Sequence, residues 1–455
     1  MAGGARDLAL ELLGAVESGR AYPGLALDRA LERGGLAGAD RRLVTELVYG
    51  TTRTRNTLDW ALGVHLRRPL ASLPQAIRNA LRLGAYQILY LDRVPASAAC
   101  NESVELARRY GHRGTAALVN AVLRRLAEEG LPPLPEDRTD SLALAHHHPR
   151  WLVERWLDRL GAPGTVALLT ANNRVPPTAV RVNRLRSSPE AVLAELGRLG
   201  IAARPSELAP EGLLLDEHPP LRGLGPFRRG ELQVQDESSM LAAPALAPIP
   251  GAVVVDACSA PGGKATHLAE LMGDRGEVLA VDVSRGRLRL VEEAARRLGL
   301  ASVRTMVADA RELGRLLPGA ADAILVDAPC SGLGTLRRRP DLRWTKQPAD
   351  IASLARLQRA LLDGVAGCLK PGGILLYSTC SAEPEENQEV VESFLEDDGR
   401  FGWEDPLERL PEKARQLLAG RDRPEGSRGP GWLQLWPQLD GTDGFFLARM
   451  RKERG

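Results

Sequence analysis

The chain has 455 residues, of which 44% are hydrophobic, and this is enough for two or three separate cores. Its 60 basic and 58 acidic side chains leave a formal net charge of only +2, so the overall charge gives no indication of a nucleic-acid partner. No apolar run approaches the roughly 20 residues that cross a bilayer, which leaves a membrane role without support. The cysteines are odd in number, lack C-x-x-C spacing and follow no leader-like segment, which is typical of a reduced, cytoplasmic protein: Cys100, Cys258, Cys330, Cys368 and Cys380.

The first part of the chain has the periodicity of helices. Apolar residues recur at helical spacing over 5–19, 40–62, 73–91 and 114–130, and no strand-like alternation interrupts them. A proline-rich stretch at 131–140 follows and is typical of a linker. We therefore predict an all-α domain over residues 1–140.

The charge within this predicted domain is uneven. Between Thr51 and Arg125 the chain has 12 arginines and four acidic residues. Phosphate binding accounts for such a segment, because each cation placed on a phosphate releases condensed counterions. A solvated helical face accounts for it equally well, and both interpretations stay open here.

The three histidines at 146–148 have no acids or cysteines close by in the sequence, and we expect no metal site there.

Residues 150–230 show a mixed pattern. A helix is predicted over 151–161 and a strand over 178–183, and a second helix runs from Ser188 to Gly200. Short extended runs follow around Ile201 and at 212–215. This pattern predicts a small α+β module.

Residues 231–455 are predicted to form an α/β domain. The run 251–271 gives a β-branched strand, Asp256, a turn of small residues and a helix that begins near Gly263. Such a turn lets backbone N–H groups approach a ligand closely. The G-x-G-x-x-G and Walker patterns are both absent, so neither a dinucleotide nor a triphosphate is favoured. We expect the following residues of the turn to bind a cofactor: Cys258, Ser259, Ala260, Pro261, Gly262, Gly263 and Lys264.

Further strands of this domain also end in chemically active side chains. Asp282 ends the second strand, where an acid can hold two ribose hydroxyls, and Asp309 follows the third. The apolar run 323–326 leads to Asp327 and Cys330, and another strand ends at Cys380. With helical patterns between the strands, this predicts a doubly wound, Rossmann-like sheet with an adenosine-containing ligand at its carboxyl edge.

Motifs in both parts of the chain resemble a known family. ELVYGTTR, RLGAYQILYL, ACNESVELARR and LVNAVLRR are similar to the NusB-type helical RNA-binding domain that some rRNA methyltransferases carry. DACSAPGGKATHLAE, VDAPCSGLGTLRRRPDLRW and LLYSTCSAEPEENQEVV resemble successive motifs of the Nop/Sun family of RNA cytosine-5 methyltransferases. The resemblance covers essentially the whole chain, with mild departures at Ser259 and Ala265. It implies a class I methyltransferase fold, S-adenosyl-L-methionine as cofactor and small-subunit (16S) ribosomal RNA as substrate.

The resemblance also implies residue roles. Carbon 5 of cytosine is a poor nucleophile until a cysteine thiolate adds at C6, and by resemblance this nucleophile is Cys380 while Cys330 assists product release. Asp282, Asp309 and Asp327 would line the cofactor pocket, with Asp327 binding the cofactor or the base. The target base must be unstacked, which suits single-stranded or loop RNA. The resemblance assigns RNA contacts to Arg181 and Asn183, whereas Arg337, Arg338 and Arg339 either contact RNA phosphates or are only solvated.

Two alternatives stay open at this point. One is a methyltransferase of another RNA or of DNA, in which the Pro-Cys pair makes Cys330 the nucleophile. The other is a non-catalytic RNA-binding or antitermination factor that relies on the helical domain, although the intact cofactor motifs argue against it. For the leading hypothesis we expect a monomer whose partner is ribosomal RNA, with no metal and no membrane partner.

Overall fold

The computed structural model describes residues 4–19, 24, 27, 30, 38–216, 219–424 and 426–454. They fall into two units, the first drawn from 1–173 and 336–346 and the second from 174–335 and 347–455. None of the described helices combines the length and the hydropathy that crossing a bilayer requires.

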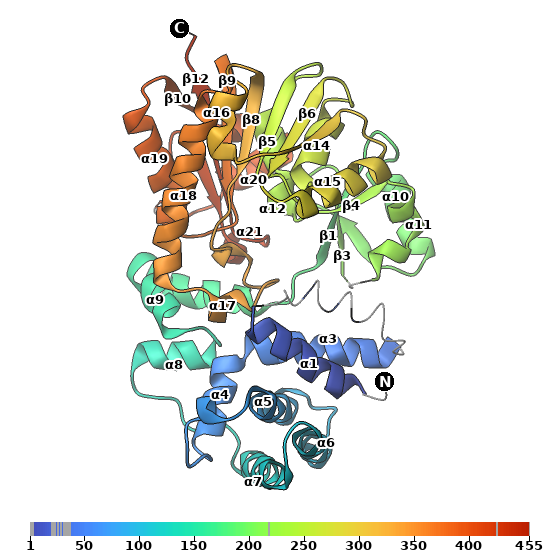
Figure 1. The fold of residues 1–455 in the computed structure, drawn as a ribbon, viewed down its shortest axis with the longest axis vertical. Helices are drawn as coiled ribbons and strands as arrows, with labels where there is room; N and C mark the ends of the chain where they lie inside the picture. The colour runs from blue at the N-terminus through green and yellow to red at the C-terminus, as the bar shows by residue number, and fades with distance from the viewer. Residues whose placement is uncertain are drawn as a thin grey trace. The chain divides into compact units, whose positions relative to one another are not determined.

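The first unit is helical throughout its described part, which confirms the all-α prediction (Figure 1). Its helices are α1 (Ala5–Glu17), α3 (Gly38–Arg53), α4 (Arg55–Gly63), η1 (Leu70–Ser72), α5 (Gln75–Tyr90), α6 (Ala96–Arg109), α7 (Arg113–Glu129), α8 (Arg138–Ala145), α9 (Arg150–Asn173) and α17 (Leu342–Thr345). One apolar core joins α1, α3, α4, η1, α5, α6 and α7, with Leu47, Leu58, Leu81 and Val119 fully buried.

Three boundaries in this unit differ from the sequence expectations. The pattern at 40–62 forms two helices, α3 and α4, which are separated at Thr54. Helix α8 begins inside the proline-rich stretch, where the Asp137 side chain accepts a hydrogen bond from the Asp140 N–H and caps the helix. Helix α9 continues beyond the predicted 151–161, across a kink at Gly161, whose φ is 63°. Glycine adopts this left-handed conformation without the steric cost of a Cβ.

The segment 336–346 is separated from the rest of the first unit in sequence but is part of it in space. Arg343 is buried and donates hydrogen bonds to the carbonyl oxygens of His147 and Asn172, both at 2.8 Å. The indole N–H of Trp344 donates to the Thr52 carbonyl oxygen at 2.5 Å. A buried guanidinium requires such acceptors, and these bonds therefore fasten the segment to the helices.

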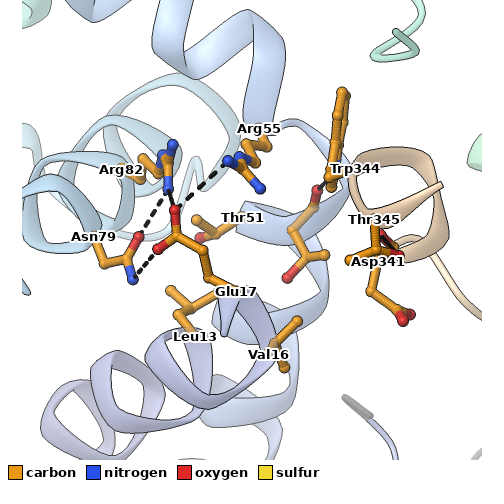
Figure 2. Close-up of a pocket in the computed structure, with 11 residues that line it drawn as sticks. Leu13, Val16, Glu17, Thr51, Arg55, Asn79, Arg82, Asp341, Trp344 and Thr345 are labelled. Atoms are coloured by element: carbon orange, nitrogen blue, oxygen red, sulfur yellow. Dashed lines mark hydrogen bonds and ion pairs between the residues drawn. The ribbon is translucent and has the colours of Figure 1, made fainter. Parts of the chain in front are cut away.

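A polar pocket lies in the first unit between α1, α4, α5 and α17, and Figure 2 shows Glu17 at its centre. The Glu17 carboxylate accepts hydrogen bonds from Arg78 at 2.8 Å and from Arg82 at 3.2 Å, and Arg55 lies 3.5 Å away. Burial raises the pKa of Glu17, but the charges of Arg82, Arg55 and Arg78 outweigh burial and lower it to about 2. Glu17 is therefore ionised in this pocket.

The second unit begins with a four-stranded sheet in the order β2-β3-β1-β4. Its elements are β1 (Thr178–Val182), α10 (Pro189–Arg198), β2 (Ala203–Pro205), β3 (Gly212–Leu215), η2 (Leu221–Gly223), α11 (Gly225–Arg228) and β4 (Leu232–Val234). All its pairings are antiparallel, and Val180, Val182, Leu196 and Leu213 form a small core. This is the predicted α+β module.

The remainder of the second unit is an eight-stranded sheet in the order β10-β12-β9-β8-β5-β6-β7, with β11 paired to β12. Its elements are α12 (Glu237–Met240), α13 (Ala242–Leu246), β5 (Val253–Ala257), α14 (Gly263–Leu271), β6 (Glu277–Asp282), α15 (Arg285–Leu298), β7 (Val303–Val307), η3 (Ala310–Glu312), α16 (Leu313–Leu316), β8 (Ala321–Asp327), η4 (Leu333–Thr335), α18 (Pro348–Ala366), β9 (Leu369–Thr379), η5 (Pro384–Glu386), α19 (Gln388–Asp397), β10 (Phe401–Glu404), η6 (Pro406–Arg409), α20 (Glu412–Ala419), β11 (Trp432–Leu435), α21 (Pro437–Asp440) and β12 (Phe445–Lys452).

Strands β5 to β9 are parallel to one another, whereas the pairings of β12 with β9, β10 and β11 are antiparallel. Alternate residues of one strand enter different cores. Val254 packs in the core that α14 and α15 cover, and Val255 packs in the core that α18 and α19 cover, so helices lie on both faces (Figure 1). The predicted doubly wound sheet is confirmed, with antiparallel strands added on one side. Its parallel strands bring their carboxyl ends to one edge.

Candidate active site

The turn after β5 has the geometry that a nucleotide pocket requires. Cys258 and Gly262 have φ angles of 61° and 100°, and α14 begins at Gly263, as predicted. A Cβ on Gly262 would lie 3.0 Å from the Cα of Val291, so only glycine fits between the turn and α15. The turn therefore brings its backbone and the N-terminus of α14 to the carboxyl edge of the sheet, where a nucleotide would bind.

A buried carboxyl group supports this turn from below. Asp256 is fully buried, and its Oδ2 accepts a hydrogen bond from the Ser259 hydroxyl at 2.9 Å. Burial, followed by the negative charge of Asp327, raises the pKa of Asp256 to about 7. Cys258 lies in the same acidic surroundings, where burial and the charges of Asp327, Asp256 and Asp282 raise the pKa of its thiol to about 12. This thiol therefore stays protonated and is not a nucleophile.

Arg181 and Asn183 brace the turn from the four-stranded sheet. Arg181 is fully buried, forms an ion pair with Glu270 at 2.8 Å and donates to the Gly263 carbonyl oxygen at 2.7 Å. The amide of Asn183 donates to the carbonyl oxygens of Gly230 at 3.1 Å and Leu298 at 3.0 Å. These bonds favour a role in holding α14 and α15 in place, and the RNA contacts of both residues stay a prediction.

Three acidic residues stand at or just beyond the carboxyl ends of successive parallel strands. Asp282 ends β6 and Asp327 ends β8, while Asp309 lies two residues beyond the end of β7. Asp282 accepts a hydrogen bond from the Ser284 N–H at 2.8 Å, and Arg311 pairs with Asp309 at 2.6 Å. Carboxylates suit both the ribose hydroxyls and the positive sulfonium of S-adenosylmethionine, so this donor set fits the cofactor that the sequence implies.

Asp327 is further held by two neighbours. The Lys264 ammonium group donates to its Oδ2 at 2.7 Å, and the Ser378 hydroxyl donates to its Oδ1 at 3.0 Å. The Lys264 Nζ also lies 5.0 Å from the centre of the Phe445 ring. The glycine turn, β8 and β9 thus meet at one carboxylate.

The two candidate catalytic cysteines also meet at this edge. Cys330 follows β8 and Cys380 follows β9, both are partly exposed, and their Sγ atoms are 3.1 Å apart. The hydrogen bond with Cys380, then burial and the nearby negative charges, raise the pKa of Cys330 well above its ordinary value. Cys330 therefore holds its proton, while its sulfur touches that of Cys380.

Gly334 allows the two loops to approach each other. The Gly334 N–H donates to the Cys380 carbonyl oxygen at 2.9 Å, and the Gly334 carbonyl oxygen accepts a hydrogen bond from the Gly444 N–H at 2.8 Å. A Cβ at Gly334 would lie 2.3 Å from the Gly444 carbonyl oxygen, which excludes any side chain. The glycine in the motif after Cys330 is thus required for loop packing.

Comparisons with known proteins agree with this geometry. Residues 243–451 match the family model for the 16S rRNA methyltransferase RsmB/F, residues 4–128 match the NusB family, and residues 148–222 match the ferredoxin-like domain of RsmF/B-like methyltransferases. A "Probable ribosomal RNA small subunit methyltransferase B" of Bacillus subtilis (strain 168) is 40% identical over 452 residues, which cover 98% of each chain. The protein belongs to the RsmB/F family of 16S rRNA methyltransferases.

Other members and solved structures extend this similarity. The ribosomal RNA small subunit methyltransferase B of Pseudomonas putida is 37% identical over 448 residues, or 98% of each chain. The crystal structure of PH0851 covers 99% of this chain and 100% of its own, with a TM-score of 0.85 and 28% identity. NSun6 from Pyrococcus horikoshii, solved with the S-adenosylmethionine analogue SFG, covers 68% of this chain and 99% of its own, with a TM-score of 0.58 and 26% identity.

The predicted site residues of this RsmB/F family member are divided between the two units. The turn from Cys258 to Lys264, the three acidic residues and the two cysteines belong to the second unit. Arg337 and Arg338 belong to the segment 336–346 of the first unit, and Arg337 is buried. Cys100 and Cys368 are buried in the cores, and burial raises the pKa of both thiols.

Sequence reasoning missed the polar groups that hold the cysteine loops. Glu386 is buried between them and accepts hydrogen bonds from Ser331 and Ser381. The only sequence signal was an acidic pair, Glu385 and Glu386, a few residues after Cys380. Nothing in the sequence shows which of the two faces the crevice.

Proposed function

We propose that this protein methylates C5 of a cytosine in small-subunit (16S) ribosomal RNA through a covalent bond between Cys380 and C6 of the base. The observation that carries the proposal is the pair of thiols, Cys330 and Cys380, with Sγ atoms 3.1 Å apart beside Asp327. A covalent mechanism needs one sulfur that attacks the base. It benefits from a second thiol that can donate a hydrogen bond to this sulfur when the bond to the base breaks.

The proposed steps assign a task to each residue. The Cys380 thiolate attacks C6, an S–C6 bond forms, and the C5–C6 double bond gives up its electrons to C5. S-adenosylmethionine, when bound, would supply the methyl group that C5 accepts and would leave as S-adenosylhomocysteine. Water then takes the C5 proton, the electrons of the C5–H bond restore the C5–C6 double bond, and the S–C6 bond breaks with its electrons returning to the Cys380 sulfur. The Cys330 thiol stabilises this departing thiolate by donating a hydrogen bond to it.

The acidic residues and the glycine turn would hold the cofactor in this scheme. Asp282 would bind the ribose hydroxyls, Asp309 would border the adenosine, and Asp327 would face the base or the methyl donor. Lys264 would fix the orientation of Asp327 through their ion pair. The turn residues Cys258, Ser259, Ala260, Pro261, Gly262 and Gly263 would contribute backbone groups.

The parts of the chain outside the catalytic domain would bind RNA. We propose that residues 1–140 form the RNA-binding helical domain, 150–230 the module that grips RNA, and 231–455 the catalytic domain. The match of residues 4–128 to the NusB family supports this assignment for the helical domain. Of the 12 arginines between Thr51 and Arg125, Arg55, Arg78 and Arg82 surround Glu17, and the proposal draws its phosphate contacts from the others. In this scheme the partly exposed Arg338 contacts RNA phosphates. The predicted RNA residues Arg337, Arg181 and Asn183 are buried and would support the grip from within the fold.

Two cysteine variants test the chemistry. The proposal expects Cys330→Ala to accumulate a covalent RNA adduct, because product release is impaired, and Cys380→Ala to form none. The adduct is measured as a slower-migrating protein band on denaturing gels after incubation with unmodified small-subunit rRNA and S-adenosylmethionine. Cys368→Ala, a buried cysteine outside the crevice, is the matched control and should behave as the unchanged protein. An adduct in Cys380→Ala but not in Cys330→Ala would make Cys330 the nucleophile and contradict the assignment.

Two measurements separate the alternatives. Mapping the labelled nucleotide after reaction with labelled cofactor identifies the base and the position that are methylated. Titration calorimetry with S-adenosylhomocysteine separates a methyltransferase from a non-catalytic RNA-binding factor. A methyltransferase should bind this cofactor product, whereas a non-catalytic factor has no need to bind it.

A further inference from the structure

A buried carboxylate lies behind the two cysteines and contacts the loop of each. Glu386 ends η5 and is fully buried. Its Oε1 accepts a hydrogen bond from the Ser331 N–H at 2.7 Å, and its Oε2 accepts from the hydroxyls of Ser331 and Ser381, each at 2.5 Å. The two serine hydroxyls are themselves 3.2 Å apart.

These contacts have a direct consequence for the cysteines, because each serine is the next residue after one of them. Ser331 follows Cys330 and Ser381 follows Cys380. A single carboxylate therefore joins the two loops one residue beyond their thiols. Its removal would release both loops from a common anchor.

Two further residues fix Glu386 itself. Gln358 of α18 donates from Nε2 to the Pro329 carbonyl oxygen at 2.9 Å and to Glu386 Oε1 at 3.3 Å. The Tyr377 hydroxyl donates to the Glu386 backbone carbonyl oxygen at 2.6 Å. These contacts thus connect Glu386 to β9, to the loop after β8 and to helix α18.

The charge of this carboxylate also acts on the Cys330 thiol. In the described part of the chain the Glu386 carboxylate accepts hydrogen bonds from neutral donors, and burial raises its pKa above its ordinary value. Two titratable groups act on Cys330, namely Cys380 after β9 and Glu386 of η5. A third group, Tyr377 of β9, lies close enough to interact with a charge on Cys330. A negative charge at Glu386 disfavours a second negative charge on Cys330.

We propose that Glu386 is the positioning residue of the cysteine pair, holding the Cys330 thiol against the sulfur of Cys380 through Ser331 and Ser381. This inference rests on the proposed function for its catalytic meaning, since it explains how one of two adjacent cysteines stays a thiol while the other attacks. Glu386 acts through its neighbours and touches neither reacting sulfur in the described contacts.

The test compares Glu386→Gln with Glu392→Gln. Glutamine keeps the size of the side chain but removes its charge, and Glu392 is an exposed residue of α19 that receives the same substitution. The first measurement is the rate of alkylation of Cys330 and Cys380 against pH by mass spectrometry, on the full chain without RNA. The second is turnover on small-subunit rRNA, and the third is affinity for S-adenosylhomocysteine.

We expect Glu386→Gln to shift the alkylation profile of Cys330 to lower pH and to reduce kcat by at least about tenfold, as loss of orientation does. Affinity for S-adenosylhomocysteine should stay within about twofold, because the cofactor turn keeps its contacts, and Glu392→Gln should match the unchanged protein in all three measurements. An unchanged alkylation profile together with unchanged turnover would overturn the role of Glu386. If the glutamine variant loses cofactor affinity, Ser381→Ala is used instead, because it removes only one donor to the carboxylate. Its alkylation profile and its turnover then decide whether Glu386 positions the cysteine pair.

The alkylation measurement separates this inference from the proposed function. It uses the free protein and reports on the thiols whatever RNA base is methylated. If mapping shows methylation at a position other than cytosine C5, the proposed function fails, while the pH profile still decides whether Glu386 controls the cysteine pair.

Discussion

Two glutamates of this protein, Glu17 half-buried in the helical unit and Glu386 buried in the catalytic unit, show how partners set the role of the same side chain. Glu17 is surrounded by Arg55, Arg78 and Arg82, and its pKa is lowered to about 2. Figure 2 shows two of these arginines, Arg55 and Arg82, beside it. Glu386 in the catalytic unit is held by hydroxyl and amide donors, and its pKa is raised by burial. Fixed positive charges make the first a permanent anion that stabilises the fold. Neutral donors leave the second more easily protonated, which suits a group that controls a neighbouring thiol.

The largest effect that tests this comparison is on stability. Glu17→Gln should lower the free energy of unfolding by about 2 kcal/mol at pH 7, because three arginines lose their common anion. Urea unfolding followed by circular dichroism measures the change. Glu129→Gln, an exposed residue of α7, is the control and should have an effect below about 0.5 kcal/mol.

The same variant has a defined pH window. A lowered pKa gives stability that is complete above the unfolded value of 4.5 and is lost as the pH falls toward about 2. The difference between Glu17→Gln and the unchanged protein should therefore shrink over this range. A difference that is constant from pH 7 to pH 2 would show that the charge of Glu17 is not what stabilises the unit.

A smaller effect is expected where the partners are neutral. Ser331→Ala removes one hydroxyl donor from Glu386 but keeps the backbone N–H bond at 2.7 Å, and it should cost about 1.5 kcal/mol. It should also slow turnover while leaving affinity for S-adenosylhomocysteine unchanged. A stability loss without any change in turnover would mean that Glu386 and its serine donors stabilise the fold but do not position the cysteines.

The smallest effect concerns Asp256, which is fully buried. Its pKa is raised to about 7, so its contribution to stability is present at low pH and is lost as the pH rises through 7. Between pH 6 and pH 8 the free energy of unfolding of the unchanged protein should fall by about 1 kcal/mol more than that of Asp256→Asn. Thermal unfolding of both proteins at the two pH values measures this, and parallel losses in the two proteins would contradict the raised pKa.

The order of the motifs along the chain was enough to predict much of the catalytic domain. A β-branched strand before Asp256, a glycine turn and a helix beginning near Gly263 are local features, and the structure has β5 and α14 there. The helical periodicity of the first part likewise predicted an all-α unit. Exact ends were less predictable, since the extension of α9 to Asn173 depends on how the residues beyond Gly161 pack and not on the local pattern.

The neighbours of the predicted site residues could not be read from the sequence. Arg181 carries no sign in its strand that Glu270, 89 residues later, is its partner. The segment 336–346 follows a catalytic motif, yet Arg343 finds its acceptors in the helical unit. Such contacts join residues that are far apart in the chain, and they depend on which elements pack together.

The sequence by itself determined the succession of strands and helices, the glycine turn and the presence of two cysteines after two strands, because these follow from local spacing and residue type. Only the tertiary structure decided that the two sulfurs lie 3.1 Å apart, and that one buried carboxylate joins their loops. The physical reason is the parallel sheet, which brings the ends of β8 and β9 together although Cys330 and Cys380 are 50 residues apart in the chain.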